Sequence, residues 1–341
     1  MIPLIERLKA TSPKAATRAL LAYILLTLCA LSVRADEVLV IDSYHASYPW
    51  TQECRQGLIQ QLHPQHRVSY VELDTKRIPK AQFRKAANNA WLRYRDLSPD
   101  LVIIMDDNAL NLLGERISQD GTPVVFMGIN NNPRRYFSEA IPTNVTGVLE
   151  RPSLKRSTYM IQRLIRPGLE KKLLLMMDAG PTSYAIIDTS LEGQTRARFG
   201  DSILRTYLTS NWEEWQRKIK RLKKEQYDAL IIANYAAIKD RNGEQITLDH
   251  VSEWTSRHSE IPVFAFWGYS VGPGKALGGL IISGVDQGRN AAQIANEILD
   301  GVRYPKIRSP ISGELTYSES ELKRWSIALP DDLRQAATMV D

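Results

Sequence analysis

Four ring-bearing side chains gather in one short segment near the start of the chain. Residues 38–41 (VLVI) form an apolar run that is typical of a buried β-strand. Directly behind this run, a loop of seven residues holds Tyr44, His45, Tyr48 and Trp50. In open α/β sheets, ligands bind outside the carboxyl ends of the strands. We therefore expect this loop to be part of a surface that recognises a small molecule.

Further polar and aromatic residues follow other apolar runs at the point where each strand would end. With the loop residues they form the candidate ligand-binding set: Ser43, Tyr44, His45, Trp50, Asp107, Asn108, Asn130, Asn131, Asp178, Tyr184, Asn234, Tyr235, Trp267, Tyr269 and Asp286. Aromatic faces with a few aimed polar groups are typical of a small-molecule cleft. Because the set holds acids, amides and rings but no lysine or arginine, it disfavours a strongly anionic ligand.

Some of the polar residues also have a purely structural interpretation. Asp106-Asp107-Asn108 begins a predicted helix, so at least one of the three is expected to cap it. Asp107 and Asn108 could equally pair with an amine or hydroxyls of a ligand. Asn130 and Asn131 tolerate turn conformations well, so a turn role competes with ligand binding. The sequence leaves these alternatives open.

A second aromatic loop, Trp267-Gly268-Tyr269, mirrors the first from the other half of the chain. Two such loops facing one another across a cleft could hold a planar or sugar-like ligand between them, because aromatic faces provide a large contact area. For Trp50 the alternative is that it packs as a lid on its own half of the protein.

Apolar runs alternate with helical stretches along the whole chain, which is the pattern of βαβ units on a parallel sheet. In the first half the pattern predicts strands at 38–42, 68–73, 101–105 and 124–127, and helices at 51–62, 80–95 and 108–118. In the second half it predicts strands at 172–177, 203–208, 229–233 and 263–266, and helices at 183–199, 212–225 and 247–257. The expected fold is therefore α/β, with two doubly wound parallel-sheet lobes.

The first 35 residues have the pattern of an export signal. Basic residues precede a short apolar run at 19–31, and small residues stand at the −3 and −1 positions of a cleavage site after Ala35. An uncleaved anchor is the alternative. The leader holds five of the 44 basic residues and one of the 38 acidic ones, which leaves 39 against 37 in residues 36–341. This near-balance disfavours a nucleic-acid partner. Cys54, alone in that range, is expected to be a small buried residue.

Several segments resemble the sensor-associated branch of the ABC-transporter substrate-binding family. They are SYHASYPWTQECRQGL (43–58), DTKR (74–77), PDLVIIMDDNA (99–109), PVVFMGIN (123–130) and NVTGVLE (144–150), with GVDQGR (284–289), ILDG (298–301) and SIALP (326–330) in the second half. The resemblance implies a periplasmic-binding-protein fold of type 1, a clamshell with a small ligand between two lobes joined by three crossovers. The lobes would comprise 36–148 with about 285–310, and 149–284 with about 311–341.

The same resemblance implies a function. The protein is expected to be exported to the periplasm, where it closes on a small ligand that could be aromatic, amino-acid-like or sugar-like. It would present the closed form to an ABC permease or to a membrane sensor kinase or cyclase.

Motifs for catalysis and cofactors are missing from the sequence. There is no phosphate-cradling Walker loop, no Gly-x-Ser-x-Gly elbow and no HExxH metal motif. We expect no enzyme activity, no cofactor and no metal ion. The alternative from another class is an exported hydrolase on a similar α/β scaffold. The basic run at 217–224 carries no aromatic platform, so a solvated helix face is favoured over a nucleic-acid surface.

Overall fold

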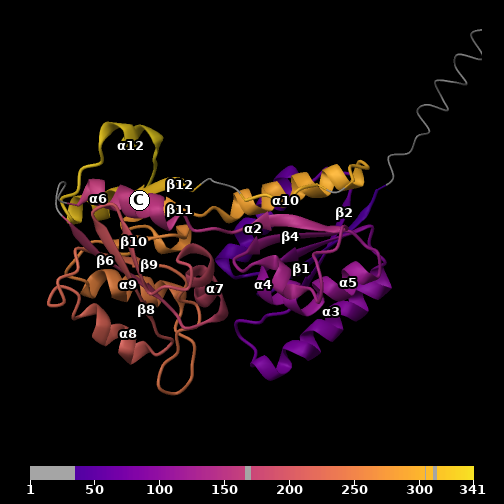
Figure 1. Cartoon of the computed structure of the whole chain (residues 1–341), viewed down its shortest axis with the longest axis horizontal. Helices are drawn as coiled ribbons and strands as arrows, with labels where there is room; N and C mark the ends of the chain where they lie inside the picture. Colours follow the sequence, from indigo (N-terminus) through magenta and orange to yellow (C-terminus); the bar gives the residue numbers. More distant parts are fainter. Residues whose placement is uncertain (1–34, 166–169, 304, 310–312) are drawn as a thin grey trace, which may run out of the picture.

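Two lobes lie side by side in the computed structural model (Figure 1), which describes residues 35–165, 170–303, 305–309 and 313–341. The predicted export signal, 1–35, falls outside the described residues apart from Ala35. Within the described ranges, no helix combines the length and the apolar character needed to cross a membrane.

The first lobe is built on a five-stranded parallel sheet in the order β2-β1-β3-β4-β5. Its strands are β1 (Glu37–Asp42), β2 (Arg67–Glu72), β3 (Leu101–Met105), β4 (Val124–Ile129) and β5 (Val145–Leu149). Helices α2 (Pro49–Gln61) and α10 (Gly284–Leu299) cover one face. The other face packs against α3 (Phe83–Leu97) and the helical stretch α4 (Asp106–Ala109), η2 (Leu110–Gly114) and α5 (Glu115–Gln119). Since both faces are covered, the central strands are apolar throughout.

Helix α10 comes from late in the chain and lies against α2 at the top of the first lobe in Figure 1. Glycines permit this close approach. A Cβ on Gly57 would lie 1.9 Å from the carbonyl oxygen of Val285, and a Cβ on Gly288 would lie 2.0 Å from that of Cys54. Cys54 is a free, buried residue in this contact, as expected.

The second lobe repeats the plan with the strand order β10-β9-β6-β8-β7. Its strands are β6 (Lys171–Met177), β7 (Arg196–Phe199), β8 (Ser202–Leu208), β9 (Ala229–Ile232) and β10 (Val263–Ala265). Helices α6 (Leu154–Leu164) and α7 (Pro181–Ser190) cover one face, and α8 (Trp212–Ile219) and α9 (Leu248–His258) cover the other. The predicted α/β fold with two doubly wound lobes is confirmed.

The chain crosses between the lobes more than once, as a multi-crossover hinge requires. It passes from β5 to α6, and returns from β11 (Gly278–Ile281) to α10. After α10, Arg308 forms a parallel β-bridge with Val148 beside the first sheet. The chain then crosses a third time, because β12 (Glu314–Ser318) pairs with β11 and β13 (Thr338–Val340) in a small third sheet. The short helices α11 (Glu319–Arg324) and α12 (Asp331–Ala336) lie between β12 and β13 in the chain. Short 3-10 turns elsewhere in the chain are η1 (Lys80–Gln82), η3 (Pro133–Tyr136) and η4 (Gly268–Ser270).

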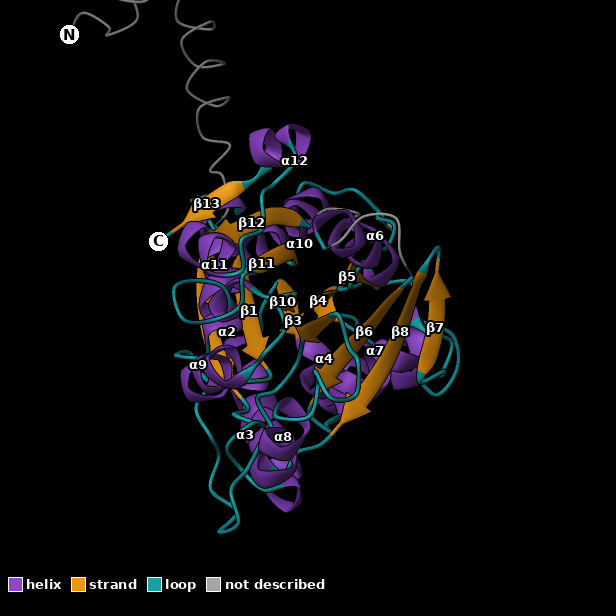
Figure 2. Cartoon of the chain, turned by 90° about the vertical axis from the view of Figure 1, so that its left-hand side faces the viewer, coloured by secondary structure: helices purple, strands orange, loops and turns teal. Residues whose placement is uncertain are grey.

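Two helix predictions in the second lobe are wrong in extent. The predicted helix 183–199 ends at Ser190, because Glu192 and Gly193 take left-handed backbone conformations with φ of 53° and 76°. The chain then forms β7, an antiparallel edge strand beside β8 (Figure 2). The predicted helix 212–225 likewise ends at Ile219 and continues as turns.

Candidate ligand-binding cleft

A small cavity lies where the carboxyl ends of strands from both lobes meet. It has a volume of about 20 Å³, which is room for about one water molecule. We call it the inner cavity. Its lining residues are Tyr44, Tyr48, Trp50, Lys76, Asp106, Asn130 and Glu150 from the first lobe, and Thr182, Asn234, Trp267 and Tyr269 from the second.

A wider cavity of about 310 Å³ shares Tyr44, Lys76, Thr182 and Asn234 with the inner one. We call it the outer cavity, and the two together the cleft. Its other lining residues also come from both lobes: Thr75, Ile78, Pro79, Lys80, Phe83 and Asn108, and Asp178, Gly180, Pro181, Ala236, Ala237 and Lys239. The strand-end rule, that ligands bind at the carboxyl ends of the strands, therefore identifies a cavity that residues of both lobes line.

Aromatic rings from both lobes line the inner cavity. The ring of Tyr48 lies edge-on to that of Tyr44 at 5.2 Å, and 6.4 Å from that of Tyr269 in the second lobe. Nε1 of Trp267 donates to Glu150 at 3.2 Å, across the lobes. Trp50 is 3% exposed, and its Nε1 has no hydrogen-bond partner among the residues that the structure describes.

Asp106 occupies a strained position at the end of β3. Its φ is 74°, a left-handed conformation that is uncommon for a residue other than glycine and is typical of functional sites. Its Oδ1 accepts a hydrogen bond of 2.7 Å from the hydroxyl of Tyr44. Burial, followed by the charge of Asp107, raises the pKa of Asp106 to about 7. Gly128 leaves room beside it: a Cβ there would lie 3.4 Å from Nε1 of Trp50.

Asn130 and Glu150 form a buried pair at the ends of β4 and β5. Nδ2 of Asn130 donates to Glu150 at 2.8 Å, while Oδ1 of Asn130 has no partner within the described ranges. Burial, and then the charge of Asp106, raises the pKa of Glu150 well above its ordinary value. Burial therefore favours the protonated form of Glu150 more than it would for an exposed glutamate.

Some predicted site residues hold the first lobe together. Oγ of Ser43 accepts from the backbone N–H of Ala109 at 2.8 Å. Ser43 therefore satisfies one backbone N–H group at the start of this helix. Oδ1 of Asp106 accepts from the backbone N–H of Asp107 at 3.1 Å, so one of the three expected residues also contributes to the cap. The carboxylate of Asp107 accepts from the backbone N–H groups of Asn130 and Asn131 and from Tyr136. Nδ2 of Asn108 donates to Thr75 at 2.9 Å at the outer cavity.

In the second lobe, Asp178 organises the start of α7. Its carboxylate accepts from the backbone N–H groups of Gly180 and Ala237 and from the side chains of Ser183 and Asn234. Burial raises the pKa of Asp178, and this effect outweighs the opposing influence of Lys76 and these hydrogen bonds. Asp178 thus fixes the loop that lines the outer cavity.

Seven residues of the candidate set do not line either cavity. They are Ser43, His45, Asp107, Asn131, Tyr184, Tyr235 and Asp286. His45 pairs with Ser47, and Tyr184 is 54% exposed on α7. Tyr235 is fully buried, and its hydroxyl lies 2.6 Å from that of Ser270. Asp286 pairs with Arg289 on α10 at 3.3 Å.

The cleft also contains Lys76, which the candidate set does not include. Nζ of Lys76 lies 4.3 Å from the ring centroid of Tyr44 and 4.9 Å from that of Tyr48, within the range of cation–π attraction. Glu150 also lines the inner cavity and is not in the candidate set. Both residues follow strands, β2 and β5, that end at the same edge as β1, β3 and β4. Applying the strand-end rule to all five strands would have found them.

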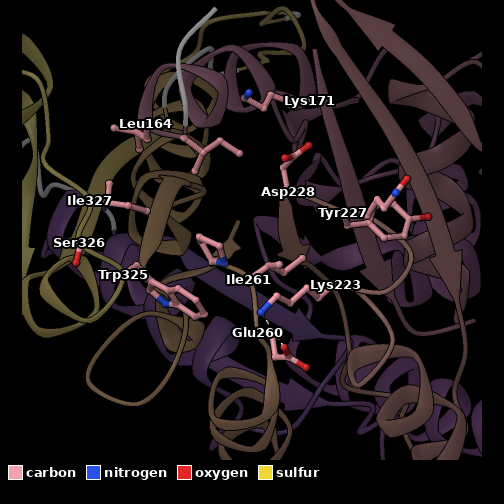
Figure 3. A pocket seen from close by; sticks show the side chains of 13 residues that line it. Leu164, Lys171, Lys223, Tyr227, Asp228, Glu260, Ile261, Trp325, Ser326 and Ile327 are labelled. Carbon is pink, nitrogen blue, oxygen red and sulfur yellow. Dashed lines mark ion pairs between the residues drawn. The ribbon is translucent and has the colours of Figure 1, made fainter. Parts of the chain in front are cut away.

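A cavity of about 580 Å³ lies at the opposite edge of the second sheet (Figure 3). It is lined at the amino ends of β6, β9 and β10 and by the segment around Trp325. An ion pair of 3.2 Å joins Lys223 and Glu260 at its margin. Since ligands in such sheets bind at the carboxyl ends, this cavity is not the candidate site.

No family model and no curated protein matches the sequence. Solved structures do match it. The ABC domain from Streptococcus pneumoniae in complex with L-Trp has a TM-score of 0.65 at 15% identity, and covers 90% of this chain and 100% of its own. The fold is that of the type 1 periplasmic binding proteins.

Other solute-binding proteins share this type 1 fold. A ligand-free, open substrate-binding protein with adhesive properties from Clostridium difficile has a TM-score of 0.59 at 15% identity, over 90% of this chain and 99% of that one. An ABC transporter solute-binding protein from Clostridium phytofermentas with bound L-rhamnose has a TM-score of 0.50 at 12% identity, over 80% and 83%. These likenesses describe the fold alone.

Proposed function

We propose that this protein binds a small solute in the cleft and closes on it. One observation carries the proposal: Trp50 and Asn130 line the inner cavity, and each has a buried polar atom, Nε1 of Trp50 and Oδ1 of Asn130, without a partner in the described part of the chain. A buried polar group without a partner costs about 1–3 kcal/mol. A ligand that accepts from Trp50 and donates to Asn130 would satisfy both atoms.

The lining favours an aromatic, amino-acid-like or sugar-like ligand. Tyr44, Tyr48, Trp50, Trp267 and Tyr269 offer ring faces, and Glu150 and Asp106 accept hydrogen bonds from ammonium or hydroxyl groups. Solved proteins of the same fold hold L-Trp or L-rhamnose, which fall within these classes. The inner cavity has room for one small group, so the body of the ligand would extend into the outer cavity.

Closure is the proposed mechanism. A ligand that contacts both lobes binds the closed state more tightly than the open state, and so shifts the population toward it. The sequence-based boundary after residue 148 is moved by two residues, because β5 runs to Leu149 and the backbone N–H of Glu150 donates to Ile129 of the first sheet. The lobes are proposed to comprise 36–150 with about 285–310, and 151–284 with about 311–341. The crossovers between them would then act as the hinge.

The cellular role follows from the export signal that the sequence predicts. We propose that the mature protein acts in the periplasm after removal of residues 1–35. It would present its closed form to an ABC permease or to a membrane sensor kinase or cyclase. The resemblance of segments 74–77 and 106–108 to the sensor-associated branch slightly favours sensing.

A thermal-shift screen of amino acids, purines, sugars and organic acids tests this function. We expect at least one compound to raise the melting temperature in a concentration-dependent manner without being consumed. Product formation that disappears on changing Asp107 or Asp178 would instead support the hydrolase alternative. A screen without any stabilising compound would contradict the proposal.

A further inference from the structure

We propose that the ligand carries an anionic group, a carboxylate or a phosphate, and that this group closes the lobes by bridging lysines on opposite sides of the outer cavity. This inference rests on the proposed function and names the class of ligand. It reverses the expectation from the sequence that a strongly anionic ligand is disfavoured.

Three lysines line the outer cavity, two from the first lobe and one from the second: Lys76, Lys80 and Lys239. Among the described residues, none of these three takes part in an ion pair, although the same structure pairs many other cations. Three positive charges around a cavity of about 310 Å³ would attract an anion strongly, because a concave site concentrates the field.

The acidic side of the outer cavity does not cancel this charge. Of the residues that line it, Asp178 alone is acidic, and its carboxylate already accepts four hydrogen bonds from its own lobe. Among the side chains that line the outer cavity, three positive charges face one negative charge, a net charge of +2. Asp106 and Glu150 line the inner cavity only, and burial raises the pKa of both, which favours their neutral forms.

Helix α7 adds a further attraction for an anion. Its first turn, Pro181 and Thr182, lines the outer cavity, and the helix runs for ten residues. Backbone N–H groups at a helix amino end are free to bind anions, and the helix dipole favours negative charge there. The unpartnered Nε1 of Trp50, 3% exposed in the adjoining inner cavity, offers another hydrogen-bond donor to the same ligand.

Two tyrosine rings hold the side chain of Lys76 at the cleft, where an anionic group of the ligand would contact it. Its ammonium lies over the rings of Tyr44 and Tyr48 at 4.3 and 4.9 Å, so the side chain is oriented before any ligand arrives. Burial lowers the pKa of Lys76, but Tyr48, Asp178 and Asp106 outweigh this effect and the pKa is raised. Lys76 therefore stays positively charged at neutral pH.

The distribution of the lysines over both lobes has a mechanical consequence. Closing the cleft brings Lys239 toward Lys76 and Lys80, and like charges repel. An anion between them converts this repulsion into attraction. The anion thus stabilises the closed state more than the open state, which is the differential affinity that a closing ligand requires.

Affinity measurements on lysine variants test the inference. Lys76→Met and Lys239→Met keep most of the apolar stem and remove the charge. Lys85→Met on α3 and Lys224→Met after α8 are matched controls, because both lysines are exposed and line neither cavity. The probes are an indole series of different charge: indole-3-acetate, L-tryptophan and tryptamine, with phenyl phosphate as the phosphate member.

We expect the carboxylate- or phosphate-bearing probes to bind, and each cleft variant to weaken them at least tenfold while the controls change less than twofold. A preference for phenyl phosphate over indole-3-acetate identifies phosphate as the anionic group, and the reverse identifies carboxylate. If tryptamine or a neutral sugar binds best and the cleft variants bind it as the wild type does, the anion inference is overturned while the proposed function stands.

A second measurement does not depend on knowing the ligand. Small-angle X-ray scattering of the ligand-free protein at low ionic strength should show a smaller radius of gyration for the Lys76→Met/Lys239→Met double variant than for wild type. Inorganic phosphate should compact the wild type and leave the double variant unchanged. Identical scattering of the two proteins under both conditions overturns the inference, even if the probe series fails to bind.

Discussion

Asn130 and Asn131 are adjacent in the chain but have different surroundings. Asn130 is 1% exposed, lines the inner cavity and keeps an unpartnered Oδ1 within the described ranges. The side chain of Asn131 points its Oδ1 to the backbone of Asn132 and to Arg135, outside the cleft. The same residue type thus provides a test residue and its control.

Asn130→Ala should weaken the solute that stabilises the protein most by about tenfold, because losing one buried hydrogen bond costs about 1–2 kcal/mol. Asn131→Ala should change the affinity less than threefold. Isothermal titration of both variants makes the comparison. Equal affinities in Asn130→Ala and wild type would remove Asn130 from the site.

Asp106 makes stability depend on pH. Its pKa is about 7 in the folded protein and near 3.8 in an unfolded chain, so between these values the folded state binds more protons than the unfolded state. The free energy of unfolding should therefore fall as pH rises from about 4 to 7, by on the order of 2–4 kcal/mol, and then level off.

Asp106→Asn should flatten this part of the curve in urea unfolding at several pH values. Tyr44, Lys76, Asp107 and Glu150 surround the group in both proteins. Burial also raises the pKa of Asp42 to about 7, so Asp42 contributes to the pH dependence of both proteins. The difference between the two curves thus reports the titration of Asp106 together with its effect on Glu150, and parallel curves would refute the assignment.

At the scale of elements, the packing of α10 on α2 attaches the second, C-terminal segment of the first lobe. Gly288→Ala should destabilise the protein by about 2 kcal/mol or more, because the added methyl group would overlap the carbonyl oxygen of Cys54. Gln293→Ala, at an exposed position of the same helix, is the control. Thermal unfolding of both variants measures the effect; similar melting temperatures would show that the contact can relax.

The pattern of apolar runs is enough to predict most elements, because buried parallel strands are apolar on both faces. Strands β1, β3 and β4 and helices α2 and α9 lie close to their predicted positions. The end of α7 was missed although Gly193 marks it, and the segment that follows forms strand β7 instead of continuing the helix.

The candidate site was also predicted only in part. Tyr44, Trp50, Asn130, Asn234, Trp267 and Tyr269 line the inner cavity as strand-end reasoning suggested. Lys76 and Glu150 were missed because they follow edge strands whose ends were not considered. Lys239 lies seven residues beyond the end of β9 and reaches the outer cavity through a loop, which no periodicity encodes.

At the scale of the whole molecule, the two lobes contact each other at several points around the cleft. Trp267 donates to Glu150, and Arg135 pairs with Asp188 at 3.1 Å. The side chains of Arg135 and Asp188 are both exposed, so this ion pair should contribute only about 0–1 kcal/mol to the closed state. We therefore expect a ligand with contacts to both lobes to be the main determinant of the closed state.

The central claim is that the solute binds between the lobes. A crystal structure of the complex with the most stabilising compound tests it most directly. We predict density in the cleft, in contact with Trp50 and Asn130 on one side and with Trp267 on the other. A ligand bound instead in the 580 Å³ cavity beside Trp325, with the cleft unchanged, would contradict the account.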